Sequence, residues 1–210
     1  ASAALSVLLQ FFLAQFLGMT TALQLMELSR ADQPLLQEML RNVPGTYQHS
    51  LQVANLAEQA AERIGADTLL TRVGAVYHDV GKLGNPQFFI ENQLHGSPNP
   101  HDSLDPPTSA EIIIRHVTGG LALAKKHRLP QRICDFILEH HGTMLTFYQY
   151  TQALQAVGGD KSLVDEPAFH YPGPRPQSRE TALLMLADGC EARVRAERPK
   201  DEKAMEVIIR

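Results

Sequence analysis

Five stretches of this chain combine a helical repeat of apolar residues with a histidine or an aspartate on the same face. His49 lies four residues before Val53, and Asp188 follows Leu184 by four residues in the run ALLMLAD. The residues placed in this way are His49, His78, Asp79, His116, His140, His141 and Asp188. One histidine on an apolar face is usually a core residue whose hydrogen-bonding groups have partners. Five separate stretches that each place a histidine or an aspartate on an apolar face need a common explanation. An unpaired buried carboxylate is energetically expensive, so these side chains are expected to find partners.

The same periodicity predicts an all-α fold. Helices are expected over 46–63, 68–80, from Ser109 onward, 119–128, 130–141, 143–156, 178–197 and 201–209. Gly65, Gly81 and Gly142 end helices in this interpretation. Two Pro-rich stretches, 84–108 and 157–177, are expected to be long loops. The three consecutive isoleucines after Ser109 also suit a strand, but the segment is interpreted as helical from its continuation, and no strand is expected.

A metal centre in the core of the helical bundle would explain the inward-facing residues together. Neutral imidazoles and carboxylates are common metal ligands, and a cation offsets the carboxylate charge. Five histidines and two aspartates make seven ligands, which is too many for one ion and suits two ions that share a bridging carboxylate. The donor set favours Fe or Mn, with Zn, Co or Ni as alternatives. Two ions about 3.5–4 Å apart have the geometry for phosphate ester hydrolysis.

Composition narrows the function classes. The 210 residues are enough for one domain with a full core, and the formal net charge of −4 gives no reason to expect binding to a nucleic acid polymer. Cys134 and Cys190 lack the spacing of a redox or zinc motif, and both are predicted to be buried thiols in a reducing compartment.

The chain is expected to have three parts. Residues 1–19 are nearly free of charge and are interpreted as the end of a membrane helix or a membrane-proximal segment, with an ordinary buried helix as the alternative. Residues 20–43 are predicted to be a helical connector, and 44–210 to be the domain that carries the candidate metal ligands.

The order H…HD…H…HH…D resembles the HD-domain phosphohydrolases, and specifically their dinuclear branch. The closer resemblance is to the membrane-anchored, seven-transmembrane HD type, which are cyclic-di-AMP phosphodiesterases. It runs from about residue 20 to the C-terminus. The segments that carry it are PGTYQHSLQVANLAE (44–58), RVGAVYHDVGKLGNPQFFIENQ (72–93), NPHDSLDPPTSAEIIIRHV (99–117), LPQRICDFILEHHGT (129–143), YPGPRPQSRE (171–180) and LADGCEA (186–192).

The resemblance implies a role for each residue. Asp79 would bridge two metal ions; His49, His78 and Asp188 would complete one site, and the three remaining histidines the other. These three are His116, His140 and His141. The resemblance also implies a domain on the cytoplasmic side of the cell membrane, attached through the N-terminal segment and upstream helices. A homodimer is retained as a candidate assembly.

Four residues near this set are candidates for substrate contact. Lys82 follows the HD pair by three residues and is expected to hold a phosphate or assist the leaving oxygen; the alternative is a solvated lysine. Arg175 and Arg179 offer donors for phosphate, and Tyr171 offers a ring on which a base could stack. The alternative is a rigid surface turn in which Arg179 pairs with Glu180.

The sequence therefore predicts a metal-dependent phosphodiesterase that acts on a cyclic dinucleotide, foremost cyclic-di-AMP, with linear 5′-pApA as product. Cyclic-di-GMP is disfavoured because no Gly-Tyr-Pro follows His140-His141. A mononuclear nucleotidase would leave His116, His140 and His141 without a role. The alternative from another class is a domain that senses a cyclic dinucleotide without cleaving it.

Overall fold

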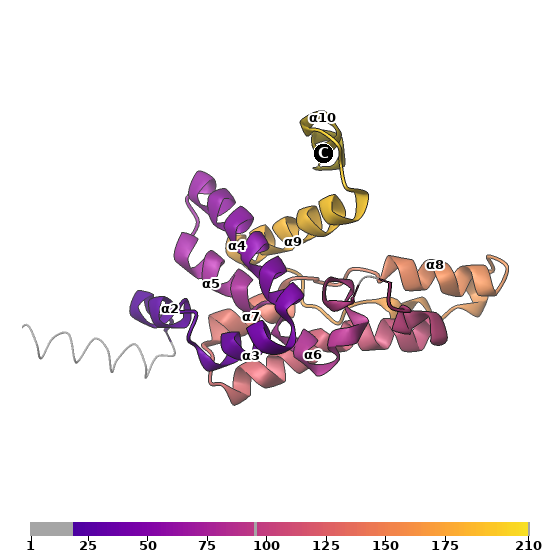
Figure 1. Ribbon diagram of the computed structural model, residues 1–210, viewed down its shortest axis with the longest axis horizontal. Coiled ribbons are helices and arrows are strands. Elements are labelled where there is room, and N and C mark those ends of the chain that lie inside the picture. The colour runs from indigo at the N-terminus through magenta and orange to yellow at the C-terminus, as the bar shows by residue number, and fades with distance from the viewer. Residues whose placement is uncertain (1–18, 95, 210) are drawn as a thin grey trace, which may run out of the picture.

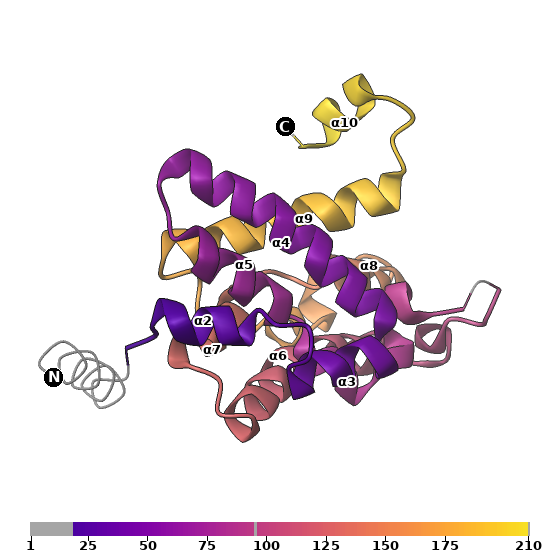
Figure 2. The same ribbon diagram turned by 60° about the vertical axis from the view of Figure 1, so that its left-hand side comes forward.

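The computed structural model describes residues 19–94 and 96–209, and within these ranges the protein is all-α, as predicted. Figures 1 and 2 show the arrangement of the helices. They are α2 (Ala22–Leu28), α3 (Pro34–Asn42), α4 (Pro44–Ile64), α5 (Thr68–Tyr77), α6 (Pro106–Lys126), α7 (Gln131–Glu139), α8 (Phe147–Ala156), α9 (Arg179–Glu197) and α10 (Glu202–Ile209). The described residues contain no strand, only an isolated antiparallel bridge between Leu145 and His170.

Helix boundaries follow local chemistry. Helix α4 starts with Pro44 at its first position and ends at Gly65, which adopts the left-handed conformation with φ of 66°. Asp67 caps α5 by accepting a hydrogen bond from the Leu70 backbone. A capping box of Ser178 and Thr181 starts α9.

Several predicted boundaries differ from the structure, among them the start of α8, which lies at Phe147 and not at 143. Helix α6 is continuous from Pro106 to Lys126, whereas the sequence predicted a start at Ser109 and a separate helix over 119–128. The side chain of Asp105 caps the helix by accepting from the Thr108 backbone, which explains the earlier start. The predicted helix 68–80 instead ends at Tyr77, and a 3₁₀ turn, η1 (Val80–Gly84), follows His78 and Asp79.

The long loops are ordered by short 3₁₀ turns. These are η2 (Pro86–Phe88), η3 (Ile90–Asn92), η4 (Pro100–Ser103), η5 (Lys161–Leu163) and η6 (Glu166–Phe169). In the first loop, the imidazole of His101 lies 2.9 Å from the Phe88 carbonyl and 2.7 Å from Ser109 Oγ. Asn99 accepts from the His101 backbone and so helps to order the loop.

The main core lies where α4, α5, α7 and α9 meet, and α4 and α9 run side by side (Figure 2). Helices α2 and α3 add Leu25, Leu36 and Met39 to this core, so the predicted connector packs against the domain. A smaller cluster around Phe169 and Tyr150 joins α6 and α8.

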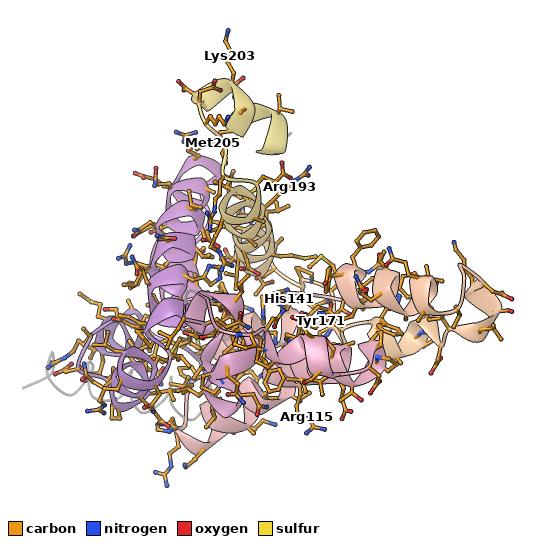
Figure 3. The ribbon with its side chains drawn as sticks, turned by 45° about the vertical axis from the view of Figure 1, so that its right-hand side comes forward. Arg115, His141, Tyr171, Arg193, Lys203 and Met205 are labelled. Atoms are coloured by element: carbon orange, nitrogen blue, oxygen red, sulfur yellow. The ribbon has the colours of Figure 1, made fainter. Side chains whose placement is uncertain are left out.

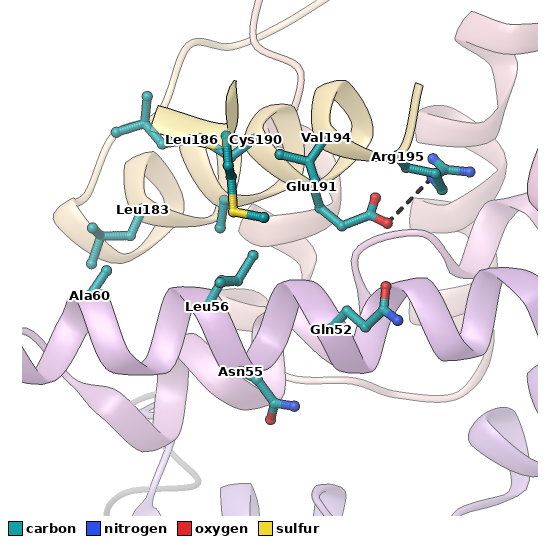
Figure 4. A pocket seen from close by; sticks show the side chains of 12 residues that line it. Gln52, Asn55, Leu56, Ala60, Leu183, Leu186, Cys190, Glu191, Val194 and Arg195 are labelled. Atoms are coloured by element: carbon teal, nitrogen blue, oxygen red, sulfur yellow. Dashed lines mark ion pairs between the residues drawn. The ribbon is translucent and has the colours of Figure 1, made fainter. Parts of the chain in front are cut away.

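A groove of about 830 Å³ runs between α4 and α9 and reaches Met205 of α10 (Figure 4). Leu56 of α4 is 46% exposed and lines the groove. The groove also corrects one prediction. Cys134 is buried as predicted, but Cys190 is only half-buried because it borders the same groove.

The expected membrane segment over 1–19 falls outside the described residues except for Met19. Among the helices that the structure describes, none is both long and apolar enough to cross a bilayer.

Candidate metal centre

The helices bring together all seven inward-facing residues predicted from the sequence. His49 lies in the second turn of α4, His116 in the middle of α6, and Asp188 in the middle of α9. His78 and Asp79 follow α5, and His140 and His141 follow α7. All are buried except His141, whose side chain is 19% exposed. Figure 3 shows His141 and Tyr171 beside one another near the junction of the helices.

Three imidazoles are oriented by the backbone of their own segment. Nδ1 of His78 and of His140 lies 2.7 Å and 2.8 Å, respectively, from a carbonyl oxygen three residues earlier, and His116 makes the same contact. The acceptors are the carbonyls of Ala75, Ile137 and Ile113. A carbonyl only accepts, so Nδ1 carries a proton and Nε2 is the ring nitrogen that faces the centre.

Asp79 lies between two groups of histidines. Its Oδ2 atom is 3.3 Å from His78 Nε2 and 3.6 Å from His49 Nε2. Its Oδ1 atom is 3.4 Å from His116 Nε2 and 3.7 Å from His140 Nε2. The two oxygens of one carboxylate therefore face different sets of imidazoles.

Asp188 approaches the centre from α9. Its Oδ1 atom is 3.0 Å from His49 Nε2 and 3.8 Å from His78 Nε2, and its Oδ2 atom is 3.8 Å from His141 Nδ1. The seven residues contain two groups of three in which all ligand atoms lie within 4.8 Å of one another. One group is His49, His78 and Asp79, and the other is His116, His140 and His141.

The buried polar atoms at the centre suit divalent metal ions. Among the described residues, His78 Nε2, Asp79 Oδ1 and His141 Nδ1 are buried without a hydrogen bond. The Nε2 atoms of His116 and His140 lie 3.1 Å apart, although each imidazole holds its proton on Nδ1. Two facing lone pairs repel, and a cation between them removes the repulsion. Buried nitrogen and oxygen atoms that lack a hydrogen-bond partner and face one another are what a set of metal ligands requires.

The centre has a charged half, formed by Asp79, Asp188 and the histidines beside them, and a neutral half. Burial opposes ionisation of Asp79, but the charges of His78 and Lys82 outweigh it and hold the pKa of Asp79 well below its usual range. The pKa of Asp188 is also lowered well below its usual range, because the hydrogen bond with His49 and the nearby imidazole of His78 outweigh burial. In return, these carboxylates overcome burial and raise the pKa of His78 to about 10.

The second half of the centre holds neutral imidazoles. Burial lowers the pKa of His116, and it lowers the pKa of His140 well below its usual range. Burial lowers the pKa of His141 to about 3. All three rings are therefore uncharged near neutral pH and ready to donate a lone pair.

Lys82 lies at the centre rather than in solvent. Its Nζ atom is 2.7 Å from Asp79 Oδ2 and 2.7 Å from Glu91 Oε1, and it lies 5.0 Å from the ring centroid of Phe89. Burial opposes the charge, but the carboxylates of Asp79 and Glu91 outweigh it and raise the pKa of Lys82. The alternative of a solvated lysine is wrong.

The other three substrate candidates lie at different distances from the centre. The ring of Tyr171 packs 4.3 Å from that of His141 and is largely buried. Arg175 is exposed beside Gly142 and donates from Nε to Thr143 Oγ1 at 3.3 Å. Arg179 is exposed on the first turn of α9, nine residues and about 13 Å along the helix from Asp188.

Sequence reasoning missed three glutamates that support these residues, of which Glu139 and Glu191 are buried and Glu91 is half-buried. Glu91 pairs with Lys82, and Glu191 lies 2.6 Å from His49 Nδ1. Glu139 accepts from Thr181 Oγ1 at 2.6 Å and from the Gln177 backbone at 2.8 Å, which fixes the 171–178 loop against α7. Two of them had a signal: Glu139 directly precedes His140, and Glu191 lies three residues after Asp188.

Comparison with known proteins agrees with this geometry. The HD domain family matches residues 46–193. This chain is 44% identical to "Cyclic-di-AMP phosphodiesterase PgpH" of Bacillus subtilis over 203 residues. The match covers 97% of this chain and 28% of that relative. The chain is 46% identical to an uncharacterized protein of Synechocystis over 95% of this chain and 25% of that relative. The chain thus spans about a quarter of the length of these curated relatives.

A solved structure shares the fold. The crystal structure of the phosphodiesterase PgpH HD domain of L. monocytogenes superposes with a TM-score of 0.78 at 44% identity, over 85% of this chain and 81% of that one. A second crystal structure of the same domain, in complex with cyclic-di-AMP, also gives a TM-score of 0.78 at 43% identity, over 84% and 79% of the two chains. Motif order, helical architecture and both comparisons agree, and this chain belongs to the HD domain family.

Proposed function

We propose that this HD domain is a metal-dependent phosphodiesterase that hydrolyses cyclic-di-AMP to linear 5′-pApA. The observation that carries the proposal is the position of Asp79, whose two carboxylate oxygens face different groups of histidines at 3.3–3.7 Å. A carboxylate placed in this way can bridge two metal ions, and two-metal sites are a common solution for phosphate ester hydrolysis.

The seven clustered residues would hold two divalent ions. We assign His49, His78 and Asp188 to one ion, His116, His140 and His141 to the other, and Asp79 to both. When bound, the ions would supply an activated water and Lewis-acid polarisation of the phosphoryl oxygen. Nitrogen and oxygen donors without thiolate favour Fe or Mn.

Lys82 would act on the phosphate itself. An ammonium group has three donors, and Asp79 and Glu91 accept two of them. The third remains for a phosphoryl or leaving oxygen, whose negative charge increases as the P–O bond breaks. The two carboxylates prevent the side chain from turning away, so the ammonium is preorganised for this role.

Replacing Lys82 with methionine tests this assignment. We expect Lys82→Met to lower kcat by about 10²–10³-fold, the loss typical of one electrostatic donor, with both metal ions retained. Steady-state kinetics and metal analysis by mass spectrometry measure the two effects. Lys126→Met, on the exposed end of α6, is the matched control and should keep normal turnover. Equal activity of the two variants would contradict the role.

The 171–178 loop would contact the rest of the dinucleotide. Arg175 is exposed beside the helix end that carries His140 and His141, and its guanidinium can bind a phosphate oxygen. The ring of Tyr171 borders the centre through His141 and leaves little free surface for stacking on a base. Arg179 lies farther away, so any contact that it makes would be with the outer part of the substrate.

The choice of adenine rests on the relatives, since the B. subtilis relative is named a cyclic-di-AMP phosphodiesterase and a homologous HD domain was crystallised with cyclic-di-AMP. The deciding experiment incubates the Mn- or Fe-loaded protein with cyclic-di-AMP and, separately, with cyclic-di-GMP, and separates the products by chromatography. We expect selective conversion of cyclic-di-AMP to pApA. Tight binding without product, in protein that holds two metal ions, would indicate a sensor instead.

We further propose that the chain acts at the cell membrane with this domain on the cytoplasmic side. Support comes from the apolar composition of residues 1–19 and from the cyclic dinucleotide assigned as substrate. A homodimer stays a candidate assembly. Fractionation of cells that make the full-length protein, followed by protease treatment of inverted vesicles, would test both the attachment and the side.

A further inference from the structure

His49 differs from the other buried histidines in the partner of its outer nitrogen. His78, His116 and His140 direct Nδ1 to a backbone carbonyl three residues earlier. Nδ1 of His49 instead forms an ion-pair contact of 2.6 Å with Glu191 Oε2, without the geometry of a full hydrogen bond. Its inner nitrogen, Nε2, lies 3.0 Å from Asp188. Among the described residues, Glu191 is therefore the one that contacts the His49 ring on the side facing away from the centre.

Glu191 is itself held in place. It lies on α9 three residues after Asp188, so the two side chains leave the same face of the helix. It is only 9% exposed, and its Oε1 atom pairs with Arg195 Nε at 3.3 Å, as Figure 4 shows. Arg195 also lies 3.5 Å from Glu91, the partner of Lys82. One arginine therefore ties together the carboxylates behind His49 and behind Lys82.

We propose that Glu191 is a positioning residue for the metal centre. It holds the His49 ring with Nε2 turned toward Asp79 and Asp188, and its negative charge makes the imidazole a stronger ligand. Carboxylates behind a ligating histidine act in this way in many metal sites. The inference rests on the proposed metal centre and concerns only the ion assigned to His49, because the other three oriented imidazoles use backbone carbonyls that substitution cannot remove.

The test measures Mn²⁺ binding to purified protein. In Glu191→Gln, one of the two ions should bind about 10–100-fold more weakly while the other keeps its affinity. Glu191→Asp keeps the charge and should recover part of the loss, which a purely structural role would not give. Glu197→Gln is the matched control, because Glu197 lies on the same helix, is exposed, and pairs only with Arg193 among the described residues. Melting by circular dichroism checks that each variant folds.

A second readout separates this inference from the proposed function. In metal-free, ¹⁵N-labelled protein, Glu191→Gln should shift the ring resonances of His49 more than those of His78, His116 or His140. Wild-type protein that binds Mn²⁺ without hydrolysing a cyclic dinucleotide would overturn the proposed activity and leave the inference standing. Two Mn²⁺ ions bound to Glu191→Gln as tightly as to Glu197→Gln, or unshifted His49 resonances, would overturn the inference.

Discussion

The Asp79→Asn variant is expected to lose both metal ions and at least about 10³-fold in turnover, more than removal of a single electrostatic contact costs. The asparagine side chain has nearly the same shape, but it is neutral and only one of its two terminal atoms is an acceptor. Oδ1 and Oδ2 of Asp79 face different pairs of histidines, so an amide directs its NH₂ at one group and offers the other only a neutral oxygen. Neither ion would then have an anionic ligand at this position. The buried ammonium of Lys82 would also lose its charged partner.

Metal analysis of the purified variant is the primary measurement, with product formation as the second. Asp32→Asn removes the same charge from an exposed pair with Arg30 and should keep both ions and full activity. A selective loss of one ion in Asp79→Asn would show that the neutral amide oxygen is a sufficient ligand for the other ion. Two tightly bound ions with normal turnover would contradict the bridging assignment altogether.

The sequence predicted the fold and located the clustered residues because both depend on helical periodicity. His49, His116 and Asp188 each lie among apolar residues at helical spacing, so their direction follows from their positions. His78, Asp79, His140 and His141 lie at helix ends, where periodicity weakens, and the adjacent apolar runs still placed them near the core. The direction of each carboxylate oxygen is a tertiary property and became visible only in the structure.

The glutamates at the centre were not predicted from the sequence, for identifiable physical reasons. Glu91 lies in a 3₁₀ turn of a long loop, where no repeat predicts which way a side chain points. Glu191 lies on α9 near half-exposed Cys190 and exposed Leu186, so its helix reads as a surface helix at that point. The partners of Glu191 come from α4 and from within α9, and that pairing requires knowing how the two helices pack.

The Gly81→Ala variant is expected to destabilise the fold strongly and to disrupt the centre, although Gly81 is not among the proposed ligands. Gly81 lies in η1, which packs against α6. A Cβ atom there would lie 1.8 Å from the His116 carbonyl oxygen and 2.5 Å from the Gly120 nitrogen. Both are backbone atoms of buried residues on the inner face of α6 and cannot move aside independently. We expect a loss of about 3 kcal/mol in the free energy of unfolding, near the upper end for overpacking.

For a chain of this length, such a loss lowers Tm by about 6–12 °C, which thermal unfolding by circular dichroism can measure. Because η1 follows Asp79 directly and α6 carries His116, relief of the clash would separate the two, and metal affinity should fall as well. Gly84→Ala is the matched control, since the described structure leaves its Cβ position free of atoms within 4 Å and the change lies in the same turn. If Gly81→Ala had the same Tm and metal content as Gly84→Ala, η1 would be able to shift without loss of stability. The close packing of η1 on α6 would then not be what holds Asp79 against His116.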